Sequence, residues 1–214
     1  MFRFETEAYK NGYAAVAGID EVGRGPIAGP VVAAAVILPD VADLPAVTDS
    51  KKIAPSRRAE LAAEIKSLSG VQIGLGIVES TEIDRINILQ ATYQAMRKAL
   101  NELSPSADYA LVDGKPVPEL PVPSTAIVRG DSRSASIAAA SIIAKVTRDS
   151  MMMDYDKVYT GYQFADHKGY GTRQHLEVLR ELGACPIHRR SFGPVSRVIN
   201  GGYYQPEFNL STDS

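Results

Sequence analysis

A regular alternation of strand-like and helix-like segments constrains the fold of this chain more than any other feature. It follows two apolar runs, residues 13–19 and 31–38, whose small and β-branched residues favour a hairpin-like pair of strands around a glycine-rich loop. Further strands are predicted over 71–78, 109–112 and 125–128, and helices over 56–67, 81–103, 134–156 and 172–182. This order predicts an α/β domain with a mixed central β-sheet and helices on both faces.

Length and composition narrow the class of protein. The 214 residues predict one domain over 1–198, including a small helical C-terminal portion, and a loose tail over 199–214. An apolar fraction of 45% and a charged fraction of 22% are typical of a globular protein. The run 31–38 is too short to span a bilayer, and acids at Glu5 and Glu7 argue against a signal peptide. The single cysteine excludes a disulfide framework, so we expect a cytoplasmic protein.

The charges are unevenly distributed, although the net charge is only −2. Residues 1–128 contain 12 basic and 16 acidic side chains, whereas residues 129–197 contain 11 basic and 7 acidic ones. A basic C-terminal half fits a polyanionic partner such as a nucleic acid. Chance clustering on a solvated surface explains the same numbers equally well.

Carboxylates end three of the predicted strands: Asp20 and Glu21 the first, Asp113 the fourth, and Asp131 the fifth. Ligands of α/β proteins bind beyond the carboxyl ends of strands. Four acids that converge there would repel one another unless a cation offset their charge. Oxygen ligands without histidine or cysteine favour Mg²⁺ or Mn²⁺, and two such ions can catalyse phosphoryl transfer. Taken singly, each acid also fits a turn or a helix cap.

A dinucleotide-binding fingerprint is excluded by its context. Residues 23–28 match the pattern G-x-G-x-x-A, and Asp49 follows at the expected distance. The fingerprint must open a helix, however, and Pro30 and the β-branched residues after it favour a strand. Two acids directly before the loop would also repel a pyrophosphate.

Seven segments of the chain, taken in order, resemble the motifs of bacterial-type ribonuclease HII. They are 17–30 (AGIDEVGRGPIAGP), 49–52 (DSKK), 112–114 (VDG), 130–131 (GD), 136–149 (SIAAASIIAKVTRD), 167–172 (HKGYGT) and 188–192 (HRRSF). The resemblance implies a ribonuclease H-like fold and a monomeric enzyme. It implies cleavage of RNA in RNA–DNA hybrids and on the 5′ side of single ribonucleotides embedded in duplex DNA, by two-metal-ion hydrolysis that leaves 3′-hydroxyl and 5′-phosphate ends. It also implies that Asp20, Glu21, Asp113 and Asp131 bind Mg²⁺ or Mn²⁺.

The same resemblance implies how a nucleic acid is recognised. Gly23, Arg24 and Gly25 correspond to the loop that reads the ribose 2′-hydroxyl, and Tyr170 to a tyrosine that stacks on the sugar beyond the RNA–DNA junction. Glycines allow backbone groups to approach a sugar closely, and the 2′-hydroxyl is the group that distinguishes RNA from DNA. The residues that we expect to contact phosphates, with a solvated loop as the open alternative, are Lys51, Lys52, Arg189 and Arg190, with His188 as an assisting residue.

The remaining polar residues receive local interpretations. Asp149 is expected to pair with Lys145 or Arg148 on the same helix. His167 and His175 are expected to make local hydrogen bonds, and Cys185 to be inert.

Two rival functions remain open at this stage. Another nuclease of the same fold, such as a resolvase, would share the four acids without needing the Gly-Arg-Gly element. A catalytically silent binder of RNA–DNA hybrids would keep Arg24 and Tyr170 but would have no reason to keep all four acids.

Overall fold

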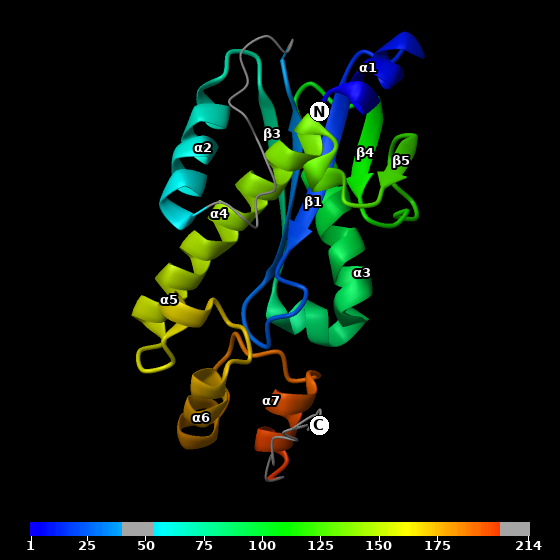
Figure 1. Ribbon diagram of the computed structural model, residues 1–214. Helices are drawn as coiled ribbons and strands as arrows, with labels where there is room; N and C mark the ends of the chain where they lie inside the picture. The colour runs from blue at the N-terminus through cyan, green and yellow to red at the C-terminus, as the bar shows by residue number, and fades with distance from the viewer. Residues whose placement is uncertain (40–53, 202–214) are drawn as a thin grey trace, which may run out of the picture.

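A mixed sheet of five strands forms the centre of the molecule, in the order β3-β2-β1-β4-β5 (Figure 1). The computed structural model describes residues 1–39 and 54–201. The strands are β1 (Val16–Val22), β2 (Val31–Ile37), β3 (Gln72–Val78), β4 (Tyr109–Asp113) and β5 (Ser124–Ile127). β1 pairs antiparallel with β2 and parallel with β4, so the predicted mixed sheet and hairpin-like first pair are confirmed.

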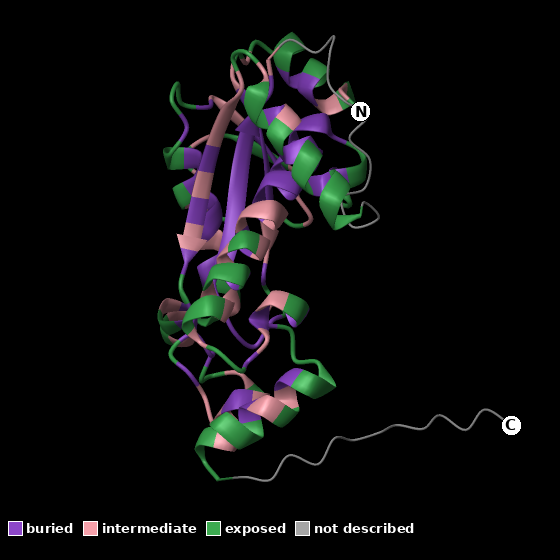
Figure 2. Ribbon diagram, turned by 90° about the vertical axis from the view of Figure 1, so that its left-hand side faces the viewer, coloured by how far each residue is buried: buried purple, intermediate pink, exposed green. Residues whose placement is uncertain are grey.

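Helices cover both faces of the sheet, as the alternation predicted. The helices are α1 (Arg3–Lys10), α2 (Pro55–Ser67), α3 (Ser80–Asn101), α4 (Ala135–Val158), α5 (Phe164–His167), α6 (Arg173–Leu182) and α7 (Gly193–Ile199), with a 3₁₀ turn, η2 (Gly130–Ser132), before α4. The apolar side of α3 packs on one face, and α2 and α4 pack on the other. Every residue of β2 is buried between these two layers, and Figure 2 shows purple inner strands beneath the helices.

The C-terminal helices lie beyond one end of the sheet. In Figure 1, α5, α6 and α7 gather below the end of β1, where the chain turns towards β2. A separate apolar cluster that contains Phe164 and Ile187 holds this part together. It includes Ala28 from the β1–β2 connection, so the C-terminal part and that connection share one core.

Helix α4 lies directly on β1 because Gly18 has no side chain. A Cβ at this position would collide with the backbone of Ser136. The N-terminus of α4 is capped by Ser134, whose hydroxyl accepts a hydrogen bond from the Ile137 amide. The hydroxyl of Thr172 likewise caps α6.

Several boundaries differ from the predictions. β1 begins later and runs on to Val22, so Asp20 and Glu21 lie within the strand rather than after it. The predicted single helix over 81–103 is wrong in one respect, because Asn87 has φ of 67° and kinks α3 there. The Asn87 side chain accepts hydrogen bonds from the amides of Leu89 and Gln90 and thereby caps the second half of the helix.

None of the helices in the described ranges is long and apolar enough to cross a membrane. Two of the predicted substrate residues, Lys51 and Lys52, lie outside the described residues, as does most of the predicted tail.

Candidate active site

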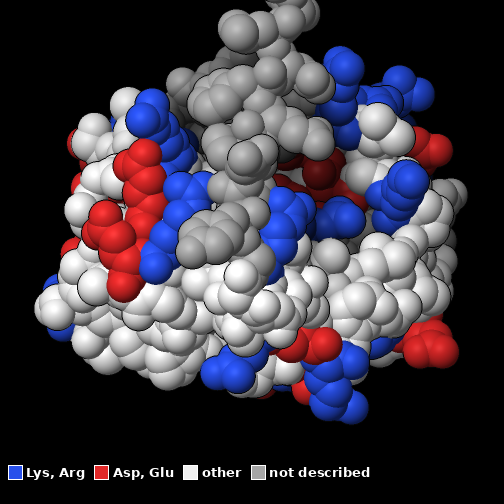
Figure 3. Space-filling model, turned by 90° about the horizontal axis from the view of Figure 1, so that it is seen from below, with Lys and Arg blue, Asp and Glu red and all other residues white. Residues whose placement is uncertain are grey.

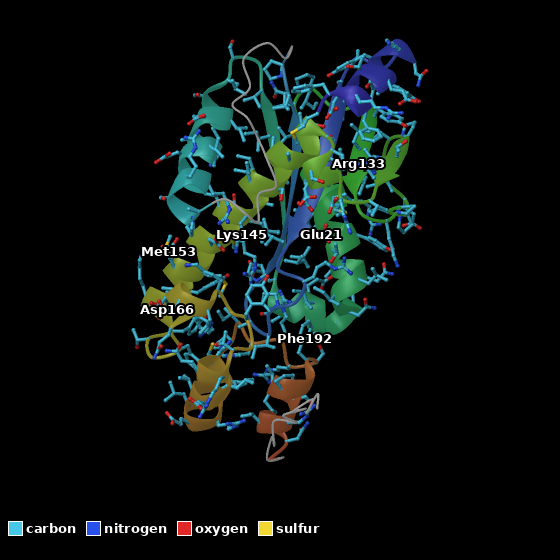
Figure 4. All side chains as sticks on the ribbon, viewed as in Figure 1. Glu21, Arg133, Lys145, Met153, Asp166 and Phe192 are labelled. Carbon is cyan, nitrogen blue, oxygen red and sulfur yellow. The ribbon has the colours of Figure 1, made fainter. Side chains whose placement is uncertain are left out.

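Asp20 and Glu21 occupy the last part of the central strand. Neighbouring residues of a strand point to opposite faces, and here Asp20 is buried towards α4 while Glu21 is half-buried. The carboxylate of Asp20 accepts hydrogen bonds from the Glu21 amide, at 2.7 Å, and from the Ser141 side chain on α4. Figure 4 labels Glu21 towards the lower part of β1.

Asp113 ends β4, the parallel neighbour of β1. The register pairs Ile19 with Val112, so the following residues of the two strands, Asp20 and Asp113, lie side by side. An Asp113 carboxylate oxygen accepts a hydrogen bond from the Gly130 amide, at 2.6 Å. This bond fixes η2, in which Asp131 is buried. The fold therefore brings the four predicted acids to one end of the sheet.

Their charges act on one another. The pKa of Asp20 is raised well above its ordinary value, first by burial and then by the negative charges of Glu21 and Asp113. An oxygen of Glu21 meets the guanidinium of Arg24 at 3.1 Å, so one acid already has a cationic partner. Figure 3 shows acidic atoms at the floor of a hollow that basic side chains border.

The site fits a divalent metal ion in its chemistry. Within residues 1–39 and 54–201, no three Asp, Glu, His or Cys side chains lie close enough together to bind one metal ion as they stand. The donors are nonetheless all carboxylate oxygens, and burial together with mutual repulsion makes a nearby cation favourable for Asp20. The residues present are therefore suited to Mg²⁺ or Mn²⁺.

The Gly-Arg-Gly loop and Tyr170 lie against each other near these acids. A Cβ built on Gly25 would lie 3.6 Å from Cε1 of Tyr170, so the ring covers this glycine. The ring is still 43% exposed, and the side chain of Arg24 is 51% exposed. Gly23 has φ of 95° and lies against the Arg148 side chain, which leaves no room for a Cβ.

Arg189 is placed differently from the prediction. Its side chain is fully buried, and its guanidinium donates hydrogen bonds to the backbone carbonyls of Gly23, Arg24, Pro26 and Gly29. In this conformation its donors serve the loop, so a direct phosphate contact does not fit the structure. Arg189 is buried because the backbone carbonyls of this tight loop point into the protein and need hydrogen-bond donors there. His188 is buried as well, which removes it from a phosphate site.

Arg190, the neighbour of Arg189, remains available to a ligand. It is exposed, and its backbone amide is held by the carboxylate of Asp84 at 2.8 Å. The structure therefore separates the two adjacent arginines, which the sequence treated alike, into a buried one and an exposed one.

Two residues next to the site were not predicted from the sequence: Ser141, which donates a hydrogen bond to Asp20, and Arg148, which is fully buried. Both are polar residues in an apolar helix, and their spacing of seven places them on one face of α4. This pattern is a sign of burial, whereas the sequence prediction gives Arg148 only as a possible partner of Asp149. The Asp149 carboxylate accepts a hydrogen bond from Lys145, at 2.7 Å, which confirms the first of its two predicted partners.

The three histidines of the chain meet in one buried cluster. His167 bonds the carbonyl of Tyr162, and Nδ1 of His175 lies 2.8 Å from the carbonyl of Tyr170, which confirms their predicted local roles. Nε2 of His175 lies 3.1 Å from Nε2 of His188. Burial lowers the pKa of His175 to about 3 and that of His188 to about 4, so both are neutral at physiological pH. Burial also raises the pKa of Cys185, in keeping with an inert thiol.

Solved structures with the same architecture define the class of protein. The ribonuclease H2 of Pyrococcus horikoshii superposes with a TM-score of 0.72 at 25% identity, covering 88% of this chain and 98% of its own. A Bst ribonuclease HIII solved in complex with Mn²⁺ has a TM-score of 0.63 at 19% identity, over 92% of this chain and 73% of its own. The fold is that of the ribonuclease H-like nucleases.

The sequence comparisons name the family. The family model described as ribonuclease HII matches residues 17–195. A ribonuclease HII of Geobacter sulfurreducens is 57% identical over 90% of this chain and 88% of its own length, and one of Geobacillus kaustophilus is 54% identical over 93% and 76%. The chain belongs to the ribonuclease HII family and is a metal-dependent endoribonuclease that acts on RNA–DNA hybrids.

Proposed function

We propose that this enzyme cleaves the RNA strand of hybrids and also cuts on the 5′ side of single ribonucleotides embedded in duplex DNA. The observation that carries the proposal is the placement of the Gly25–Tyr170 contact at the same end of the sheet as the buried acids. A sugar read by the loop would lie next to the phosphodiester bond held near the acids. The expected products have 3′-hydroxyl and 5′-phosphate ends.

The four acids would hold Mg²⁺ or Mn²⁺ at the end of the sheet. Bound ions of this kind activate a water molecule and stabilise the leaving oxygen of a phosphodiester. The residues of the chain prepare the place for them. Ser141 and the Glu21 amide orient the Asp20 carboxylate, and the Gly130 amide orients that of Asp113.

Sugar recognition falls to the loop over 23–25 and to Tyr170. A 2′-hydroxyl donates and accepts hydrogen bonds, so backbone groups that bind it would be left unpaired by deoxyribose. The half-exposed Tyr170 ring would stack on the neighbouring deoxyribose. Arg24 links the two functions, because it belongs to the loop and pairs with Glu21.

Phosphate contacts away from the cleaved bond are assigned to the exposed Arg190 and, from the sequence, to Lys51 and Lys52. They would strengthen binding without reading the sugar. We further propose that the enzyme acts as a monomer in the cytoplasm, where ribonucleotides are removed from DNA.

The test uses matched duplexes of one sequence: all DNA, a full RNA–DNA hybrid, and DNA with one ribonucleotide. With Mg²⁺ or Mn²⁺ we expect cleavage of the last two and none of the first, with the cut 5′ to the single ribonucleotide. Cleavage of the hybrid alone would overturn the proposal that the enzyme recognises a single ribonucleotide embedded in DNA. Binding of all three without any cleavage would favour the silent hybrid binder, and cleavage of all-DNA duplexes the general nuclease.

A further inference from the structure

One face of α4 runs from the acids to both substrate loops. Ser141 contacts Asp20 at the upper part of this face, and Arg148 and Met152 follow two and three turns further along. Arg148 and Met152 are both fully buried. Fully buried side chains cannot contact a substrate directly, so any effect of Arg148 on the substrate passes through the residues that it contacts.

The guanidinium of Arg148 joins two separate stretches of backbone. It donates to the carbonyls of Pro30 and Ala28, at 2.9 and 3.1 Å, in the segment that follows the Gly-Arg-Gly loop. It also donates to the carbonyl of Lys168, at 2.8 Å, two residues before Tyr170. Three donors of a single rigid group therefore set the spacing between the two loops.

Met152 packs between the same two stretches. A Cβ on Gly29 would lie 2.5 Å from its sulfur, and one on Gly169 would lie 3.2 Å from its methyl carbon. The amide of Ile27 also donates to the carbonyl of Gly169, at 2.9 Å. The close contact of α4 with both loops thus depends on the missing side chains of two glycines.

Arg189 provides a contrast within the same region. It is equally buried, but the four carbonyls that its side chain bonds all lie between Gly23 and Gly29. It supports the shape of one loop and makes no side-chain hydrogen bond to the segment that carries Tyr170. The two buried arginines therefore make different predictions.

We propose that Arg148 is a positioning residue for substrate selection, which fixes Tyr170 relative to the loop over 23–25. A single ribonucleotide offers one 2′-hydroxyl and one neighbouring deoxyribose, and both must be met in one placement. Small errors in the spacing of two such contacts cost much of the rate. The inference rests on the proposed function, because it gives Tyr170 and the loop the roles stated there.

A double-mutant cycle tests the coupling. Arg148→Lys, Tyr170→Ala and the double variant are compared by kcat/KM on the single-ribonucleotide duplex and on the long hybrid. If Arg148 acts through Tyr170, Arg148→Lys should lower kcat/KM on the single-ribonucleotide duplex about tenfold when Tyr170 is present. In the Tyr170→Ala background the same change should cost less than about twofold, a coupling typical of side chains in one network. Equal losses in both backgrounds would overturn the proposal.

Arg189→Lys is the matched control. It also removes buried donors, but its hydrogen bonds reach only the Gly-Arg-Gly loop and the residues just after it, so its coupling to Tyr170 should be clearly smaller than that of Arg148. Coupling of equal size for both arginines would mean that any damage to this region perturbs Tyr170, and the special role of Arg148 would be wrong. Melting curves of every variant show that the compared proteins are folded at the assay temperature.

Met152→Leu replaces Arg148→Lys in the cycle if Arg148→Lys does not fold. This substitution nearly conserves volume and alters the same contact between α4 and the two loops, so it should couple to Tyr170 in the same sense. If the parent enzyme cuts the hybrid but not the single-ribonucleotide duplex, the proposed function fails, and the cycle is judged on the hybrid. Coupling there still supports the positioning role, and additivity overturns it. A Tyr170→Ala variant with parental activity on both substrates would likewise overturn it.

Discussion

The acid end of the sheet and the loop support next to it, by which we mean the buried Arg148 and Arg189, differ in their electrostatics. At the acid end, like charges crowd together, and the pKa of the buried Asp20 is raised by burial and by Glu21 and Asp113. In the loop support, two buried guanidiniums are surrounded by backbone carbonyls that accept their hydrogen bonds. Burial lowers the pKa of Arg148 to about 10 and that of Arg189 to about 9, and both still remain charged at neutral pH.

This difference shows which part of the site is suited to binding a cation. A group of repelling acids gains from an added cation, whereas the two guanidiniums already have backbone acceptors for their hydrogen bonds. The acid end is therefore suited to binding a metal ion, and the loop support is suited to holding its shape. Substitutions can test these two halves of the site separately.

Asp113→Asn should abolish cleavage while leaving the fold and substrate binding intact. The change removes one charge at nearly constant volume, and the amide oxygen can still accept from Gly130. Loss of a partner that only orients a metal ligand costs about 10- to 100-fold, so loss of a ligand should cost more than about a hundredfold. Single-turnover rates in Mg²⁺ measure this. Activity within tenfold of the parent would remove Asp113 from the acid group.

Tyr170→Ala should reduce kcat/KM on the single-ribonucleotide duplex about ten- to a hundredfold, because lost stacking costs roughly 1–3 kcal/mol. The long hybrid offers many registers and should lose less. Arg190→Ala and Lys51→Ala are the matched controls. They should weaken both substrates alike and reduce the dependence on salt. Equal losses on both substrates for Tyr170→Ala would contradict stacking on the deoxyribose and would leave Tyr170 with a packing role only.

Divalent metal should raise the melting temperature of the nucleic-acid-free protein. Binding stabilises the folded state by about 1.4 kcal/mol when the free ion is at ten times its Kd. Asp20→Asn should shrink this shift and should leave the metal-free protein at least as stable as the parent, because it relieves the repulsion. Calorimetry of both proteins with and without Mn²⁺ decides the matter. An unchanged metal shift in Asp20→Asn would break the proposed contrast between the two halves.

The last prediction concerns the pH dependence of stability and the histidines next to the Tyr170 segment. Burial lowers the pKa of His175 to about 3 and that of His188 to about 4, whereas both titrate near 6.5 when unfolded. The unfolded state thus binds more protons below pH 6.5. The contribution of the histidines is complete above that pH and is lost as the pH falls towards 4, by about 1.4 kcal/mol per pH unit for each. Urea unfolding between pH 7.5 and 5 measures the slope, which should flatten in His175→Gln. A slope that the variant leaves unchanged would assign it to other groups.

The fold and the acids could be predicted from sequence because their signals are local. Apolar runs and turn residues identify the strands, and each acid stands at the end of such a run. The parallel pairing of β1 with β4 brings Asp113 beside Asp20, and the hydrogen bond from Gly130 to Asp113 brings Asp131 close to them. The parallel pairing is typical of the predicted fold class. The end of β1 was misplaced because Asp20 and Glu21 are poor strand residues, although the pairing with β2 carries the strand past them.

The loop support could not be predicted in the same way, because its partners are backbone carbonyls. A carbonyl has no residue identity, so nothing in the sequence says that Arg189 serves Gly23 and that Arg190 does not. The kink at Asn87 was hidden for a related reason, since the apolar spacing continues through it. Helices α1 and α7 are short and were absent from the predicted elements; α1 is fixed by Glu5, which binds Ser134 and Ser136 far along the chain.

The reach of Arg189 has a consequence for the synthesis of the protein. The side chain that supports the carbonyl of Gly23 comes 166 residues later in the chain. At about 5–20 residues per second, a ribosome adds that much chain in roughly 8–30 s. During this interval the loop after Asp20 and Glu21 is without its support, and the central strand β1 also lacks β4 until residue 113 has been made. The loop after the acids is therefore one of the last parts of the site to be completed, and a nascent chain lacks its Arg189 support until almost all of the protein has been made.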